Sequence, residues 1–228
     1  LAATTDGGLW RDACAAGRGP FSVVGALSAG REPSRMTDHS FDRESHGRSA
    51  DEGHDDHAHD HHHAHDVESL AAAVVTVSTS RTLDDDPAGD AIAAAFESAG
   101  HEVAVREVVG DDFDSLQSTV DRLADRDDVD TVVTTGGTGV TPDDVTIEAV
   151  SGLFAKELPG FGELFRRRSE DEIGTRVVGT RATAGIVEGV PTFCLPGSEN
   201  AARLGSEELI VPEAPHLTGL ATRPDDEE

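Results

Sequence analysis

The sequence predicts an α/β domain with a mostly parallel sheet, and three observations predict it. From residue 71 onward, short apolar runs alternate with helical stretches, the pattern of a parallel sheet with crossover helices. A glycine-rich stretch, TTGGTGVTPDDVT (134–146), stands where one apolar run gives way to a helix. The folded unit, predicted over 69–228, has a normal size for one domain.

The first half of the predicted sheet alternates strands with helices. The run AAAVVTV (71–77) predicts a buried strand. Helix 86–96 has an acidic first turn and a proline near its start, and Gly100 predicts its end. A second strand spans 101–109, and helix 112–126 carries apolar residues at spacings of three and four.

The second half ends in a hairpin and a helix. Residues 131–135 predict the third strand, and helices are predicted over 145–154 and 161–168. Residues 184–195 resemble two short strands joined by a Glu-Gly turn, and a final helix spans about 198–209.

The N-terminal part differs in composition from the rest. Residues 36–66 hold almost no large apolar side chains to offset their ordering entropy, so we predict a disordered, acidic, His-rich extension over 1–68. Met36 is the only methionine and a candidate natural start, which makes residues 1–35 candidates for non-native sequence. No signal peptide or membrane-spanning run is apparent, so we expect a cytoplasmic protein without a membrane partner.

The charge balance excludes one class of partner. The formal net charge is −27 and Lys156 is the only lysine, so the surface repels polyanions and we expect no nucleic-acid binding. Such compositions are typical of proteins adapted to high intracellular salt. Cys14 and Cys194 lie far apart in the sequence and in different contexts, which argues against a disulfide framework. We predict that Cys194 is a small buried apolar residue.

The glycine-rich stretch could bind an anion. Gly136, Gly137 and Gly139 allow close backbone approach, so successive N–H groups could form an anion nest at the start of the next helix. The stretch is neither a Walker A loop nor a dinucleotide fingerprint. A flexible strand-to-helix turn capped by Asp144 is the alternative, and it stays open at this point.

Carboxylates at two strand ends suggest a metal. Asp111 follows the second strand and Asp144 follows the third, so both could converge on one Mg²⁺ completed by phosphate oxygens and water. The alternative makes Asp111 and Asp112 N-caps of the following helix. Ser198, at the last strand end, could likewise cap a helix or bind an anion.

Arginines would supply the positive charge in a chain with one lysine. Arg81, Arg166 and Arg181 are candidate phosphate ligands. The run 166–168 could instead be a solvated helix face paired with neighbouring glutamates such as Glu163.

Several motifs together resemble one family. The stretches VSTSRTLDDDPAGDAIAAAFESAGHEV (77–103), VVTTGGTGVTPDDVTIEAV (132–150), LPGFGELFRRRSEDEIGTR (158–176), TRATAG (180–185) and LPGSENA (195–201) resemble, in order, the molybdenum cofactor biosynthesis proteins of the MoaB/Mog type, the molybdopterin adenylyltransferases. The combination of motifs is far more specific than any one of them.

This resemblance implies a fold, a reaction and an assembly. The fold would be a three-layer αβα sandwich with a mostly parallel sheet, the molybdopterin-binding fold. The reaction would transfer AMP from Mg-ATP to the terminal phosphate of molybdopterin and release pyrophosphate. Relatives of this type are usually homotrimers or hexamers. The sequence does not distinguish a molybdenum from a tungsten cofactor.

The resemblance also implies site residues. Asp111 and Asp144 would be catalytic and would hold Mg²⁺. Substrate or phosphate would contact a further set of residues: Thr135, Gly136, Gly137, Thr138, Gly139, Arg81, Arg181, Pro196, Gly197 and Ser198. Two positions depart from the family pattern, because Gly110 and Glu199 stand where many members have proline.

Other functions remain open at this point. One is a non-catalytic molybdopterin-binding or carrier protein, and another is a competence-damage-type nucleotide pyrophosphatase of related fold. A third is a metallochaperone built around GHDDHAHDHHHAHD (53–66), which holds seven histidines. Neutral imidazoles bind Zn²⁺, Ni²⁺, Cu²⁺ and Co²⁺, so we expect weak transition-metal binding unless the tract is only solvating tail.

Overall fold

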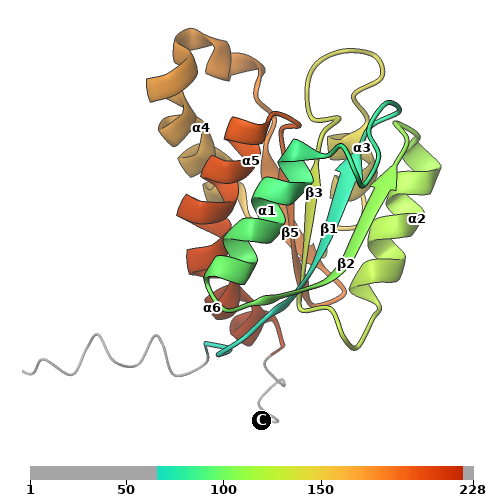
Figure 1. The fold of residues 1–228 in the computed structure, drawn as a ribbon, viewed down its shortest axis with the longest axis vertical. Coiled ribbons are helices and arrows are strands. Elements are labelled where there is room, and N and C mark those ends of the chain that lie inside the picture. Colours follow the sequence, from blue (N-terminus) through green and yellow to red (C-terminus); the bar gives the residue numbers. More distant parts are fainter. Residues whose placement is uncertain (1–65, 223–228) are drawn as a thin grey trace, which may run out of the picture. The chain divides into compact units, whose positions relative to one another are not determined.

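A computed structural model describes residues 66–222. In this range a six-stranded sheet lies between two layers of helices, which confirms the predicted three-layer αβα sandwich (Figure 1). The strands are β1 (Ala71–Val77), β2 (Glu102–Val109), β3 (Thr131–Thr135), β4 (Lys156–Glu157), β5 (Thr183–Val187) and β6 (Val190–Leu195).

The helices follow the predicted order, and the structure adds to or extends the predicted elements in several places. They are α1 (Pro87–Ser98), α2 (Phe113–Ala124), α3 (Thr146–Ser151), α4 (Pro159–Ile173), the 3-10 helix η2 (Gly174–Gly179), α5 (Glu199–Gly205), the π-helix η3 (Ser206–Ile210) and α6 (Val211–Ala221). The short strand β4 was not predicted. Helix α4 is longer than predicted and has Pro159 in its first turn. The last helical region continues to Ala221, although Pro215 lies inside α6.

The sheet is parallel in one half and antiparallel in the other. Its strand order is β2-β1-β3-β6-β5-β4. Strands β2, β1, β3 and β6 pair in parallel, and β5 runs antiparallel to both β6 and β4. Glu188 and Gly189 both have positive φ, at 47° and 84°, and connect β5 to β6, so the predicted Glu-Gly turn is confirmed. Positive φ at both central residues suits a two-residue hairpin.

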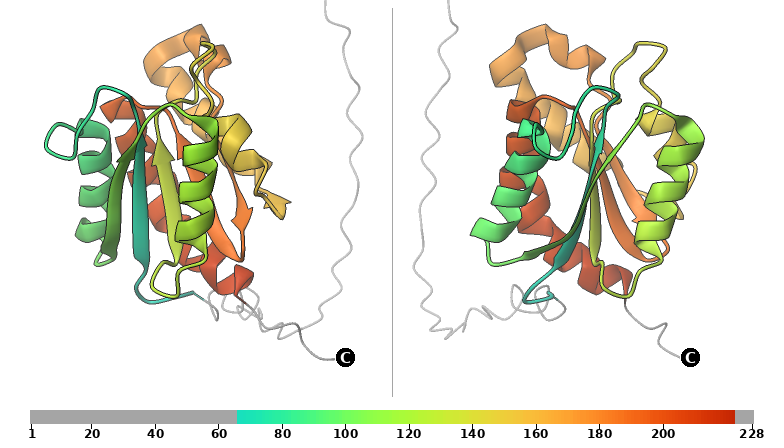
Figure 2. Two further views of the ribbon diagram at one scale, coloured as in Figure 1. Left: turned by 90° about the vertical axis from the view of Figure 1, so that its right-hand side faces the viewer. Right: turned by 45° about the vertical axis from the view of Figure 1, so that its right-hand side comes forward.

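Each face of the sheet has its own hydrophobic core. In β1, Ala72 and Val74 pack with α1, α4 and α6, whereas Ala73 and Val75 point to α2 and α3 on the other face. Because successive side chains of a strand alternate between faces, a strand covered on both sides must be apolar throughout, as AAAVVTV is. Figure 2 shows the two helical layers on opposite sides of the sheet.

Two sequence interpretations can be settled in the fold. Asp112 is the N-cap of α2 and accepts a hydrogen bond from the Ser115 amide at 2.9 Å, as the capping alternative predicted. Cys194 is fully buried in β6, and this burial raises the pKa of its thiol to about 12. The thiol therefore stays protonated at neutral pH, which agrees with a packing role.

Some predictions fall outside residues 66–222. These are the disordered N-terminal extension, the question of whether residues 1–35 are native, and all seven histidines of the 53–66 tract. Across the range that is described, no helix is long and apolar enough to cross a membrane.

Candidate functional site

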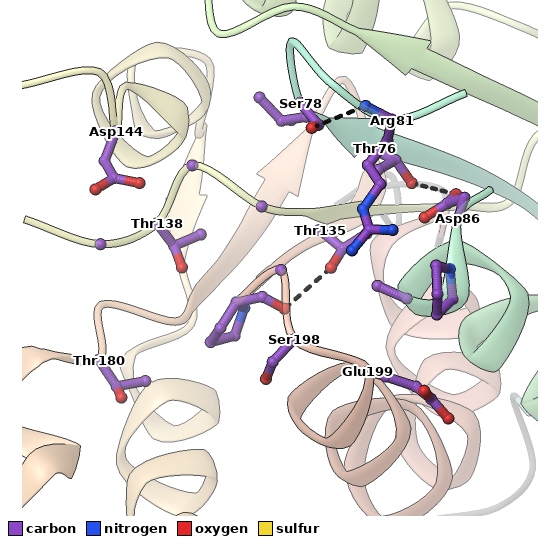
Figure 3. A pocket seen from close by; sticks show the side chains of 18 of the residues that line it. Thr76, Ser78, Arg81, Asp86, Thr135, Thr138, Asp144, Thr180, Ser198 and Glu199 are labelled. Carbon is purple, nitrogen blue, oxygen red and sulfur yellow. Dashed lines mark hydrogen bonds between the residues drawn. The ribbon is translucent and has the colours of Figure 1, made fainter. Parts of the chain in front are cut away.

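A cavity of about 570 Å³ lies beyond the carboxyl ends of β1, β3 and β6. These strands are neighbours in the parallel half of the sheet, so the loops that follow them meet at one edge. Figure 3 shows side chains from these loops converging on the cavity. The walls are formed by Thr76, Val77, Ser78, Arg81, Asp86, Pro87, Ala88, Thr135, Gly136, Gly137, Thr138, Gly139, Asp144, Gly179, Thr180, Pro196, Gly197, Ser198 and Glu199.

Backbone forms the floor of this cavity. Gly136 has φ of +103°, and a Cβ atom there would lie 2.3 Å from the Val77 carbonyl oxygen. A Cβ atom at Gly197 would lie 3.0 Å from the Gly136 Cα. Gly136 therefore has no room for a side chain against the end of β1, and a side chain at Gly197 would require the loop at Gly136 to shift by a few tenths of an ångström.

Hydrogen bonds hold the glycine-rich loop in place. The Gly136 amide donates to the Leu195 carbonyl at 3.0 Å, and the Thr146 hydroxyl donates to the Gly136 carbonyl at 2.8 Å. The Thr135 hydroxyl donates to the Pro196 carbonyl at 3.0 Å, which ties the two loops together.

These hydrogen bonds leave fewer backbone amides available for the predicted anion nest. The amide of Gly136 already has a protein acceptor, and that of Gly139 is directed to the carboxylate of Asp144. Among the four described amides of residues 136–139, those of Gly137 and Thr138 have no protein acceptor. They are the remaining candidate anion donors.

Asp144 lies on one wall of the cavity and is ionised. Its carboxylate accepts hydrogen bonds from the Thr141 amide at 2.7 Å and the Thr141 hydroxyl at 2.6 Å. The Thr141 hydroxyl is the main cause that lowers the pKa of Asp144. Helix α3 has Val145 as its N-cap and no side-chain cap, so the alternative in which Asp144 caps the helix is wrong. The carboxylate instead bonds to Thr141, three residues earlier, and so stabilises the loop in which both residues lie.

Asp111 follows β2, which is two positions from β3 in the sheet. Its carboxylate accepts a hydrogen bond from the Thr79 amide at 3.1 Å, in the loop after β1. Strand β1 stands between β2, which precedes Asp111, and β3, which precedes Asp144. Asp111 is not among the residues that line the cavity. The two predicted metal ligands thus follow strands that β1 separates, and of the two only Asp144 lines the cavity.

Arg81 is the predicted arginine that lines the cavity. Figure 3 shows its side chain between Thr135 and Asp86. Its guanidinium also forms an exposed ion pair with Asp85 at 3.2 Å. An exposed pair of this kind is weak, so the guanidinium can exchange this partner for a phosphate.

Arg181 holds the glycine-rich loop from outside the cavity. Its guanidinium donates to the Thr138 carbonyl at 3.2 Å and to the Asp144 carbonyl at 3.4 Å, and it pairs with Glu148. It is absent from the cavity lining. This geometry makes Arg181 a positioning residue for the loop that carries Asp144.

The arginine run of α4 is engaged elsewhere. Arg166 donates to the Ala182 carbonyl at 3.4 Å, and Arg168 pairs with Glu208 at 3.6 Å. Neither residue lines the cavity. These contacts favour the interpretation of a helix face whose charges have protein partners.

The last strand end contributes Pro196, Gly197 and Ser198 to the cavity, as predicted. Ser198 is the N-cap of α5, and its hydroxyl accepts a hydrogen bond from the Ala201 amide at 3.3 Å. The capping interpretation is therefore confirmed for Ser198, which also lines the cavity (Figure 3).

Sequence reasoning missed the buried carboxylate of Asp86. This side chain is 2% exposed and lines the cavity opposite Asp144 (Figure 3). It accepts hydrogen bonds from the Thr76 hydroxyl at 2.7 Å, the Gly89 amide at 3.0 Å and Arg106 at 3.1 Å. The run Asp84-Asp85-Asp86 predicted only an acidic helix start, since nothing in it singles out the buried member.

We expect Asp86→Ala to lower the free energy of unfolding by about 3 kcal/mol, because it leaves Arg106 and Thr76 without their buried acceptor. Asp90→Ala is the matched control: Asp90 pairs with the same arginine but its side chain is 62% exposed. It should cost less than about 1 kcal/mol. Denaturant unfolding of both variants measures the difference, and equal losses would contradict a structural role for the buried pair.

The fold and the cavity define an α/β domain with a candidate small-molecule site at the carboxyl edge of its sheet. Residues 73–216 match the family described as "Probable molybdopterin binding domain". The chain belongs to this family, and within it to the molybdenum cofactor biosynthesis proteins of the MoaB/Mog type.

Relatives in sequence and structure agree. The chain is 43% identical over 145 residues to Molybdenum cofactor biosynthesis protein B of Bacillus subtilis, covering 63% of this chain and 85% of the relative. A crystal structure of a Molybdenum cofactor biosynthesis protein B is 42% identical, with a TM-score of 0.66 over 69% of this chain and 99% of the other. The tungsten cofactor synthesizing protein MoaB from Pyrococcus furiosus is 37% identical, with a TM-score of 0.62 and the same coverage.

Proposed function

We propose that this protein acts in molybdenum or tungsten cofactor biosynthesis by adenylylating molybdopterin with Mg-ATP and releasing pyrophosphate. One observation carries the proposal: an ionised carboxylate, Asp144, and free loop amides share a cavity at the strand ends of a MoaB-type domain. Relatives named for molybdenum and for tungsten cofactors support the wider role without deciding between the metals.

The reaction joins two anions. A phosphate oxygen of molybdopterin attacks the α-phosphorus of ATP, a new P–O bond forms, and the bond to the bridging oxygen of the β-phosphate breaks. Pyrophosphate leaves with the electron pair. The protein needs no covalent nucleophile, so catalysis consists of positioning and charge neutralisation.

The residues of this chain suit those two tasks. The Gly137 and Thr138 amides would bind phosphate oxygens, and Arg81 would add positive charge at the cavity wall. Arg181 would act indirectly by fixing the loop between Thr138 and Asp144. Pro196, Gly197 and Ser198 would contact the substrate from the other loop.

The donors present fit magnesium. Asp144 offers an ionised carboxylate, and Asp111, which follows β2 and bonds to the loop after β1, is the second ligand that we propose. Among residues 66–222, no cluster of three or more His, Cys, Asp or Glu could hold a metal. Magnesium bound to nucleotides usually takes only one or two carboxylates, with phosphates and water completing its octahedron. When bound, it would neutralise phosphate charge.

The deciding experiment measures pyrophosphate release from Mg-ATP by the purified protein at high KCl, with and without molybdopterin. We expect release that depends on the pterin. If molybdopterin binds to the folded protein but no pyrophosphate appears, the protein is a molybdopterin carrier and the proposed activity is wrong. Release of nucleotide products without pterin would favour a pyrophosphatase. A homotrimer or hexamer is also part of the proposal, and light scattering on the same sample measures its mass.

A further inference from the structure

A second cavity, of about 360 Å³, adjoins the cavity at the strand ends, and we call it the side cavity. Four residues line both cavities and form the boundary between them: Thr180, Pro196, Ser198 and Glu199. Figure 3 shows Thr180 on one side of this boundary and Ser198 and Glu199 on the other. The rest of the side cavity is lined by residues of α4 and α5. A ligand too long for the first cavity would extend between these two helices.

Apolar side chains of both helices line the side cavity. Phe165 and Ile173 line it from α4, and Ala201 and Leu204 line it from α5. Phe165 is 1% exposed and belongs to the hydrophobic core, so it gives a fixed surface, whereas Ile173 is 42% exposed. A flat ligand between the helices would cover Ile173, and the burial of apolar surface favours binding. These walls therefore suit a planar ring.

The charged residues that line the side cavity are all acidic. They are Glu172 of α4 and Glu199 of α5, and no Lys, Arg or His is among the lining residues, all of which are described. Carboxylates repel a phosphate group, so a phosphate belongs in the first cavity, where Arg81 and the free loop amides lie. Because an ionised carboxylate is only a hydrogen-bond acceptor, the side cavity favours a ring that donates N–H groups.

Glu172 is the carboxylate that is available to such a ring. Within the described part of the chain, its side chain has no hydrogen bond or ion pair, whereas Glu199 pairs with Arg203 one turn along α5. Glu172 lines the side cavity and not the first cavity. It would therefore meet the end of a ligand that points away from the phosphate.

We propose that the side cavity binds the pterin ring of molybdopterin and that Glu172 recognises the pyrimidine edge of this ring. The inference rests on the proposed function and adds the place of the substrate's ring. A pterin presents two adjacent N–H donors, from its ring amide and its 2-amino group, on the edge opposite the phosphate-bearing side. One carboxylate can accept both in parallel, as it does from arginine. Adenine presents one donor beside an acceptor nitrogen, which a carboxylate would repel.

The test measures binding of 6-hydroxymethylpterin, a fluorescent pterin without phosphate, to the full-length protein at high KCl. We expect Glu172→Gln to raise the Kd at least about 10-fold, because a charged acceptor is lost. Wild type should bind 6-hydroxymethyllumazine, in which a carbonyl replaces the 2-amino group, at least about 10-fold more weakly than the pterin. In Glu172→Gln this ratio should fall below about threefold, since the glutamine amide can donate to that carbonyl.

Glu170→Gln is the matched control. Glu170 is an exposed residue of the same helix, two positions earlier, and it lines neither cavity. The Kd for the pterin should stay within about twofold of wild type, since exposed charges are screened at high salt. Thermal midpoints verify that both variants fold. A ratio that changes only in Glu172→Gln cannot come from a general loss of structure.

An unchanged Kd or an unchanged pterin-to-lumazine ratio in Glu172→Gln would overturn the proposal, as would the absence of pterin binding to wild type. Displacement of the pterin by adenosine, with an adenosine Kd that depends on Glu172, would also overturn it, because the nucleotide base would then occupy the side cavity. These readouts need no turnover. Pterin binding that depends on Glu172 without pyrophosphate release would contradict only the adenylylation, and release without such binding would contradict only this inference.

Discussion

Asp144→Asn is expected to lower kcat/KM for molybdopterin adenylylation by at least about 100-fold while molybdopterin binding stays largely intact. The change removes the charge that we propose faces the metal. The Thr141 amide and hydroxyl both donate to the same oxygen of Asp144, so the amide oxygen of asparagine can still accept both bonds and keep the loop closed. The loss should therefore appear in turnover far more than in binding.

The neighbouring residue provides a matched control for this variant. Asp143→Asn makes the same chemical change one position earlier, at an exposed carboxylate outside the cavity lining. It should retain activity within about twofold, since surface charges at this distance are largely screened at high salt. Pyrophosphate release and a molybdopterin binding titration on both proteins give the comparison. Full activity in Asp144→Asn would remove this residue from the mechanism.

Gly136→Ala is expected to lower the free energy of unfolding by about 3 kcal/mol or more and to abolish ligand binding. The new methyl group would lie 2.3 Å from a backbone carbonyl of β1, and φ of +103° is strained for alanine. Backbone on both sides cannot yield as a flexible side chain would. Denaturant unfolding measures the loss.

Gly160→Ala is the control for Gly136→Ala. Gly160 lies in the first turn of α4, and no atom outside its immediate chain neighbours lies within 4 Å of the added Cβ. Alanine is the better helix former, so this variant should be unchanged or more stable by up to about 1 kcal/mol. If both glycine variants unfold alike, the tight packing of the two loops is not what makes Gly136 necessary.

The sheet could be predicted from sequence because its apolar runs are unusually clear. A strand buried on both faces, such as 71–77, must be apolar throughout, and the Glu-Gly pair before Val190 indicates a hairpin. The two-residue strand β4 has no periodicity to detect. The extended last helix was missed because Pro215 indicates an end, whereas packing on the sheet keeps the helix intact.

The site could be predicted only in outline. Glycine spacing located the loop, but the Gly136 amide finds its protein acceptor at Leu195 of β6, 59 residues later, and the sequence cannot show this pairing. We predicted Arg181 as a phosphate ligand because a sequence shows that a residue is charged. It does not show where the side chain points, and in the fold the guanidinium contacts the Thr138 carbonyl. Asp86 was missed because its burial depends on Arg106 and Thr76, which come from other strands.

The contact between Gly136 and Gly197 limits how this site can change. A ligand in the cavity rests on peptide groups, and peptide groups are the same in every sequence. Point substitutions therefore cannot reshape the floor gradually, because a Cβ atom at Gly136 already collides with the Val77 carbonyl and one at Gly197 presses on the Gly136 Cα. New selectivity, whether by natural drift or in a designed library, has to come from the rim, where Thr180 and Glu199 present side chains that can be exchanged (Figure 3).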